Sequence, residues 1–120
     1  MGANSIRILP EALRSRDSAT FTGAYQTLGT PITNPSKIMK VTNNSTVLVT
    51  LSWDGISDNE ILPAGSFVLL DFTSNAGQAG YLAAAANTQF YVKGAAGSGS
   101  VYLSTYYGRQ IGIPAGPNLP

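Results

Sequence analysis

Histidine and cysteine are both absent from this sequence of 120 residues. Without histidine there is no imidazole base near neutral pH and no histidine-based catalytic triad. Without either residue the usual ligands of zinc, copper, iron–sulfur clusters and haem are missing, and disulfide bonds are excluded. We therefore expect a protein that is not an enzyme, with no catalytic residues, no metal site and no cofactor.

Charge is also scarce, because only 11% of the residues are charged whereas 43% are hydrophobic. Soluble domains usually carry about 25% charged residues. Seven Lys and Arg against six Asp and Glu leave a net charge of +1, without the basic face that nucleic acids require. A surface with so little charge suits one that becomes covered by other protein, and we expect no specific nucleic-acid binding.

Long apolar runs are missing as well. No stretch approaches the roughly 20 residues of a membrane span, and the N-terminus lacks the apolar region of a signal peptide. We expect no membrane association and assembly in a cytoplasm. The chain length fits one domain with one core.

Composition divides the chain into a body and two arms. Residues 1–18 hold much of the charge, and Pro10 followed by Glu11 could open one or two helical turns. Residues 109–120 contain three prolines and two glycines, which favour an extended tail. We predict an N-terminal arm over 1–18, a β domain over 19–108 and a C-terminal tail over 109–120, with the body able to fold without the arms.

The body has the alternation and turn spacing of a sandwich or barrel. We predict an all-β fold, an antiparallel β-sandwich or jelly-roll-like domain of six to seven strands. Two hairpins are predicted: residues 37–42 with 46–53 across Asn43-Asn44-Ser45, and residues 88–93 with 100–107 across a glycine-rich tip.

Alternation also assigns side chains to faces. Trp53 continues the apolar face of Val47, Val49 and Leu51, which predicts that it lies in the core. Tyr102 and Tyr106 point to the opposite side from their apolar neighbours, a position that marks interfaces as often as ligand sites. The strand predicted over 66–72 is apolar on both faces, which indicates burial between the sheet layers or between its sheet and a neighbouring subunit.

Asp54, Asp58 and Glu60 form the one acidic cluster that could carry chemistry. Their spacing lacks the alternating oxygen ligands and late glycine of an EF-hand, and Asp-Gly and Asp-Asn are common turn formers. We interpret the segment as a turn, with a calcium site as the alternative.

Several segments resemble small structural proteins of tailed bacteriophages. The resemblance rests on "NNS" at 43–45, "SWDG" at 52–55, "PAGSF" at 63–67, "YVKG" at 91–94 and "GSVYL" at 99–103. It implies a β-sandwich component of the virion without catalytic residues, either a cement protein of the capsid or a part of the neck or tail.

The resulting hypothesis is a homo-oligomeric virion protein, a capsid cement or decoration protein assembled in the host cytoplasm, with itself and the major capsid protein as partners. Alternatives are a neck, head-tail adaptor or tail component and, from another class, a carbohydrate-binding module. In such a module Trp53 and the tyrosines would form the platform, with Trp53 flat in a groove, and the acidic loop would be a calcium site. The candidate contacts on the arms are Ile6, Arg7, Ile8, Leu9, Leu13, Arg14, Arg16, Ile111, Ile113 and Leu119. On the sheet face they are Tyr102 and Tyr106.

Overall fold

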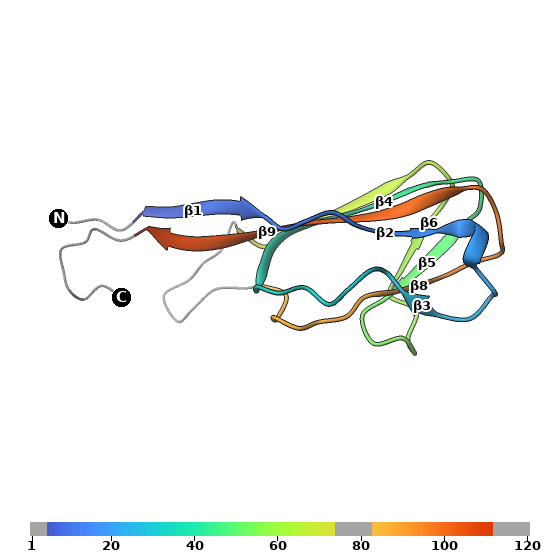
Figure 1. The fold of residues 1–120 in the computed structure, drawn as a ribbon, viewed down its shortest axis with the longest axis horizontal. Helices are drawn as coiled ribbons and strands as arrows, with labels where there is room; N and C mark the ends of the chain where they lie inside the picture. The colour runs from blue at the N-terminus through green and yellow to red at the C-terminus, as the bar shows by residue number, and fades with distance from the viewer. Residues whose placement is uncertain (1–4, 74–82, 112–120) are drawn as a thin grey trace.

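Two antiparallel β-sheets packed face to face form the fold, as the computed structural model shows for residues 5–73 and 83–111 (Figure 1). The five-stranded sheet contains β1 (Ser5–Pro10), β2 (Arg14–Asp17), β4 (Ser36–Ser45), β7 (Phe67–Asp71) and β9 (Gly99–Ile111). The four-stranded sheet contains β3 (Gln26–Thr27), β5 (Val49–Ser52), β6 (Glu60–Leu62) and β8 (Tyr91–Lys93). The predicted all-β sandwich is confirmed.

The strand order is β1-β9-β4-β7 in the larger sheet, where β2 also pairs with β9, and β3-β8-β5-β6 in the smaller one. The long strands β4 and β9 form the centre of the larger sheet, with Val41 opposite Leu103. A 3-10 turn covers Ser18–Thr20, and among the described residues no helix is long and apolar enough to cross a membrane.

Alternate residues of the central strands point between the sheets and form the core. Val49 and Leu51 of the smaller sheet are fully buried, and Val47 and Trp53 at the ends of the same face pack against the core. The Trp53 ring meets the buried Phe90 ring edge-on, with centroids 4.8 Å apart. The face predicted for Trp53 is therefore confirmed. The remaining core residues include Leu28, Ile32, Met39, Val41, Leu62, Val92, Val101 and Leu103.

Both predicted hairpins are wrong, because each pair of strands is divided between the two sheets. The chain leaves β4 in the larger sheet and enters β5 in the smaller one, and it crosses back from β8 to β9. Asn43 holds the first crossing, since its buried side-chain amide donates to the carbonyl groups of Val47 and Leu62. Alternation and turn residues look the same whether a strand pairs with the next one or crosses to the facing sheet. Among the described strands, only β5 and β6 are consecutive and paired.

The N-terminal segment is part of the larger sheet, where the sequence analysis placed an arm. Residues 14–17 pair with 100–103 of β9, and residues 5–10 pair with 106–111. Arg14 begins a strand in place of the helical turn expected after Pro10. Strand pairing thus continues past the boundaries expected at residues 19 and 108, into the segments that were predicted to be arms. The pairing partner lies about ninety residues away, so no local pattern reveals it.

One part of the larger sheet projects from the sandwich. Pairing between β4 and β9 ends at Tyr107, and beyond this residue β1 is the one described strand beside β9. Figure 1 shows the two strands extending away from the body as a two-stranded ribbon. The molecule measures 54 × 24 × 22 Å, and its radius of gyration of 16.8 Å exceeds the roughly 14 Å of a compact chain of this length. We call residues 5–10 and 106–111 the terminal ribbon.

Gly99 allows the entry into β9. Its φ of +87° lies in the left-handed region, and an added Cβ would stand 2.2 Å from the backbone oxygen of Asn44. Only glycine fits such a close approach of two backbones. This position fixes where the chain returns to the larger sheet, opposite Ser45.

Candidate interaction surfaces

The terminal ribbon exposes charge on one face and apolar surface on the other, because successive side chains of a strand point to opposite faces. Arg7 lies directly opposite Arg109 in the ladder, so the two exposed side chains point to the same side of the ribbon. Like charges placed opposite each other destabilise a strand pair. No acidic residue in the described ranges forms an ion pair with either arginine. Ile8, 43% exposed, adds an apolar side chain, and Leu9 is half-buried.

Other predicted arm residues have different outcomes. The backbones of Ile6 and Ile111 lie in the terminal ribbon, paired with Gln110 and Ser5. Ile113 and Leu119 lie outside the described residues. Leu13 is 60% exposed in the link between β1 and β2.

Arg14 has an internal role, not the contact with a partner that the sequence analysis assigned to it. Its guanidinium donates to the carbonyl groups of Thr30, at 2.7 Å, and Pro31, at 2.9 Å, and it forms a 3.0 Å ion pair with Glu11. Both charged side chains are nearly buried, at 9% and 8% exposure. Gly29 makes room for this arrangement, since an added Cβ would stand 2.6 Å from that of Arg14. The pair ties β2 to the chain between β3 and β4.

Arg16 is likewise engaged within the chain. It is half-buried and donates to the carbonyl and hydroxyl groups of Thr27 and to the hydroxyl of Thr20. Of the three N-terminal arginines expected to meet acids on a partner, Arg7 is the one whose side chain is exposed on the ribbon.

Glu11 makes the fold sensitive to acid. Burial alone would raise the pKa of its carboxyl, but hydrogen bonds from Asn34 and Thr33 and the charge of Arg14 outweigh burial and lower the pKa below its ordinary value of 4.5. A lowered pKa in the folded state means that this stabilisation is present above pH 4.5 and is lost as the pH falls through the folded value.

We expect Glu11→Gln to lower the free energy of unfolding by about 1–3 kcal/mol at pH 7, because hydrogen bonds to a charged group are replaced by weaker ones. The difference between variant and wild type should shrink towards pH 3, which urea unfolding at both pH values measures. Asp54, Asp58 and Asp71 also have lowered pKa values, but they remain in both proteins. A difference that stays constant with pH would contradict the assignment.

The outer face of the five-stranded sheet is apolar and aromatic. Tyr102 is half-buried and Tyr106 is 37% exposed, both on the side away from the core, as predicted from alternation. The neighbouring strands add Lys40, Phe67 and Leu69, with the Lys40 ammonium 4.8 Å from the centre of the Phe67 ring. We define this outer sheet face by Lys40, Phe67, Leu69, Tyr102 and Tyr106.

The sequence analysis expected β7 to be buried on both sides, and in the single chain it is not. Val68 and Leu70 pack against the core, but Phe67 and Leu69 are 59% and 54% exposed. Burial between the two layers is therefore excluded for this face. The other alternative, contact with a neighbouring subunit, remains.

The acidic loop between β5 and β6 is held by its own turn. One carboxylate oxygen of Asp54 accepts hydrogen bonds from the backbone N–H groups of Ile56 and Ser57, both at 2.8 Å, and from the Ser52 hydroxyl. These bonds, with Ser57 first, lower the pKa of Asp54 to about 2. Among residues 5–73 and 83–111, no group of three or more acidic side chains lies close enough to hold a metal ion.

Asp58 fastens the same loop to the smaller sheet. It accepts a hydrogen bond from the Tyr25 hydroxyl and forms a 3.1 Å ion pair with Lys93, whose ammonium lies 4.6 Å from the centre of the Tyr25 ring. Burial and the Asp58 carboxylate raise the pKa of Tyr25 to about 12, so the phenol stays protonated at neutral pH. The cluster holds the loop in place and contains no activated nucleophile.

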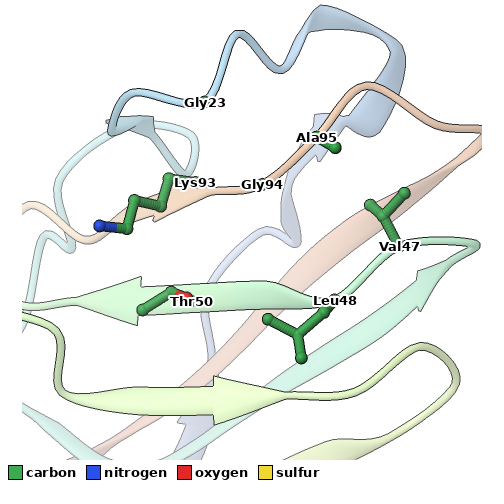
Figure 2. A pocket seen from close by; sticks show the side chains of 7 residues that line it. All are labelled: Gly23, Val47, Leu48, Thr50, Lys93, Gly94 and Ala95. Carbon is green, nitrogen blue, oxygen red and sulfur yellow. The ribbon is translucent and has the colours of Figure 1, made fainter.

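An open hollow of about 470 Å³ lies beside this cluster (Figure 2). Figure 2 shows Val47, Leu48 and Thr50 on one side of it and the chain from Lys93 to Ala95 on the other. No aromatic side chain lines it, and Trp53 packs edge-on against Phe90 instead of lying flat in a groove. The hollow itself therefore lacks an aromatic stacking platform, whereas Tyr102 and Tyr106 lie on the outer face of the other sheet.

Sequence reasoning missed that Phe67 and Leu69 are exposed, although the apolar character of both faces of their strand was the signal. It also missed Lys40, whose place beside Phe67 depends on a pairing of distant strands.

No protein-family model, no curated protein sequence and no solved structure matches this chain.

Proposed function

We propose that this chain is a non-enzymatic structural protein of a tailed-bacteriophage virion, a capsid cement or decoration protein that binds neighbouring subunits through its terminal ribbon. The observation that carries the proposal is the ribbon itself. It joins both ends of the described chain, projects from the sandwich and has no core of its own. A two-stranded ribbon is marginal in water, so contact with another protein would stabilise it.

The ribbon has the reach and the chemistry for such a contact. The part of the ribbon that lies beyond β4, residues 5–8 paired with 108–111, spans about 14 Å at roughly 3.4 Å per residue, enough to reach onto a neighbouring subunit. Arg7 and Arg109 on one side of the ribbon favour an acidic patch, because an arginine forms paired hydrogen bonds with a carboxylate. Ile8, on the opposite side of the ribbon, would add an apolar contact. The expected partners are copies of this chain and the major capsid protein.

The outer sheet face offers a second contact area for the same role. Its aromatic and apolar side chains match the composition of interface cores. A protein with few charges and two such surfaces suits many copies packed on a lattice, which is why we place it on the capsid.

A double substitution in the ribbon tests the proposal. Arg7→Glu with Ile8→Asp reverses one charge and removes the apolar contact, and both side chains are exposed, so the fold should keep its thermal midpoint. Binding is measured on particles that were assembled without the protein. We expect the apparent affinity of the double variant for these particles to be roughly 100-fold lower than that of the wild type, since like-charge contacts cost several kcal/mol.

Ile56→Asp is the matched control, because Ile56 is 83% exposed on the β5–β6 loop, away from the ribbon. It should bind particles like the wild type. Binding by the double variant at wild-type affinity would refute the role of the ribbon. Density for the protein at the neck or tail of a particle map would show that it is a neck or tail component and not a capsid protein.

A further inference from the structure

The four edges of the two sheets differ in how they are protected. β3 has two residues and β6 has three, including Glu60. The edge formed by β1 and β2 is interrupted between Pro10 and Arg14, and it carries three arginines. β7 has five residues, FVLLD, with no proline and with its one charge at the end. Natural proteins protect edges with short strands, proline and charge, and β7 lacks these devices.

The backbone of β7 leaves one row of hydrogen-bonding groups directed outward. The N–H of Asn43 donates to the carbonyl of Ser66, so every second residue from Ser66 directs its backbone groups to β4. The intervening residues direct theirs to the side away from β4, where no described strand lies. These residues are Phe67, Leu69 and Asp71.

We propose that β7 pairs antiparallel with β7 of a second copy of this chain, joining two five-stranded sheets into one continuous sheet. The pairing centres on Leu69, which lies opposite Leu69 of the second copy. Phe67 then lies opposite Asp71 of that copy, and the outward backbone groups of all three positions meet their counterparts. The inference concerns contacts between copies and holds for this chain inside or outside a virion.

Charge complementarity favours a second copy of this chain as the partner of β7, and it favours this register of pairing. Within each chain the Lys40 ammonium lies over the Phe67 ring, 4.8 Å from its centre. Because Asp71 faces Phe67 of the second copy, its carboxylate comes beside that copy's Lys40. Neither residue forms an ion pair among the described residues of the single chain. The two-fold axis makes this opposite-charge contact twice, whereas a parallel pairing would not make it.

The same geometry explains why the association closes. A two-fold contact uses the same edge of both subunits, so pairing through β7 leaves no second edge of this type. The ends of the joined sheet are then the edges with β1 and β2, which carry arginines and Pro10. We expect a dimer, not a fibre. The apolar side chains of Phe67 and Leu69 become partly covered by the cross-strand contacts.

Leu69→Lys tests the pairing in the full chain. The side chain is 54% exposed, so the fold should be retained, but two ammonium groups would face each other across the two-fold axis, beside both Lys40 residues. We expect the dissociation constant measured by sedimentation velocity to rise by about 100-fold or more. Ile61→Lys is the matched control, because Ile61 is 64% exposed on the edge strand of the other sheet. It should leave the dimer intact.

Hydrogen exchange distinguishes edge pairing from packing of the sheet faces. The amides of Phe67, Leu69 and Asp71 should be protected in the wild type and exchange rapidly in Leu69→Lys. A full chain that stays monomeric up to about 1 mM, or a dimer that leaves these amides unprotected, would overturn the inference. The ribbon variant Arg7→Glu/Ile8→Asp should still dimerise, so failure of particle binding and failure of strand pairing are separate results.

Discussion

A chain that begins at Ala19 should fail to fold cooperatively, although the sequence alone suggested that residues 19–108 could stand without the arms. Such a chain lacks β2, which covers residues 100–103 at the edge of the larger sheet. It also lacks Arg14 and Ser18, whose buried side chains bond to Thr30 and Gly99. Since a whole domain is stable by only about 5–15 kcal/mol, losing a strand and these contacts should abolish the thermal transition.

A chain that begins at Leu9 provides the comparison, because it keeps β2 and loses most of β1. It should keep a cooperative thermal transition. Circular dichroism measures this, with the full chain melted in parallel as the reference. A cooperative melt of the chain from Ala19, near the wild-type midpoint, would mean that β2 contributes little and that the sheet begins at β9.

Arg14→Ala should produce the largest effect of any single substitution outside the apolar core. Truncation leaves the nearly buried Glu11 without its ion-pair partner, and two carbonyl groups lose their donor. Removing one partner of a buried pair costs about 3–5 kcal/mol. Urea unfolding at pH 7 measures this loss.

Arg16→Ala is the appropriate comparison, since Arg16 is only half-buried and bonds to neutral groups. We expect it to cost about 1 kcal/mol. If both variants lose the same free energy of unfolding, the buried Glu11–Arg14 pair contributes no more to stability than the partly exposed hydrogen bonds of Arg16. In the double variant with Glu11→Ala, part of the Arg14→Ala cost should disappear, because the unpaired carboxylate is then absent.

The local features of the fold were predictable from the sequence. Alternation placed Val49 and Leu51 inward and Tyr106 outward, because the side-chain period of a strand is two whatever the strand pairs with. Asp54 formed the predicted turn for the same kind of reason, since its carboxylate bonds to the backbone of the next few residues. Each of these features depends on neighbours in sequence.

Features that depend on distant partners were not predictable. The roles of Arg14 and Glu11 require residues 30–34, and β1 acquires its strand conformation by pairing with residues 106–111. Nothing in the sequence of the first eighteen residues distinguishes an edge strand from a docking arm. The candidate contacts changed accordingly, with Arg14 and Arg16 assigned inward and Phe67 and Leu69 gained on the outer sheet face.

The division of consecutive strands between two sheets has a consequence for the time course of folding. β9 pairs with β1, β2 and β4, and it is the last strand of the described chain. During synthesis β1 and β2 therefore wait for a partner made more than eighty residues later. Topologies dominated by such distant contacts fold in milliseconds to seconds, and their unpaired strands are exposed meanwhile. Folding of the larger sheet should thus be completed only after β9 has been synthesised and has left the ribosome, with the unprotected strand β7 available to wrong partners until then.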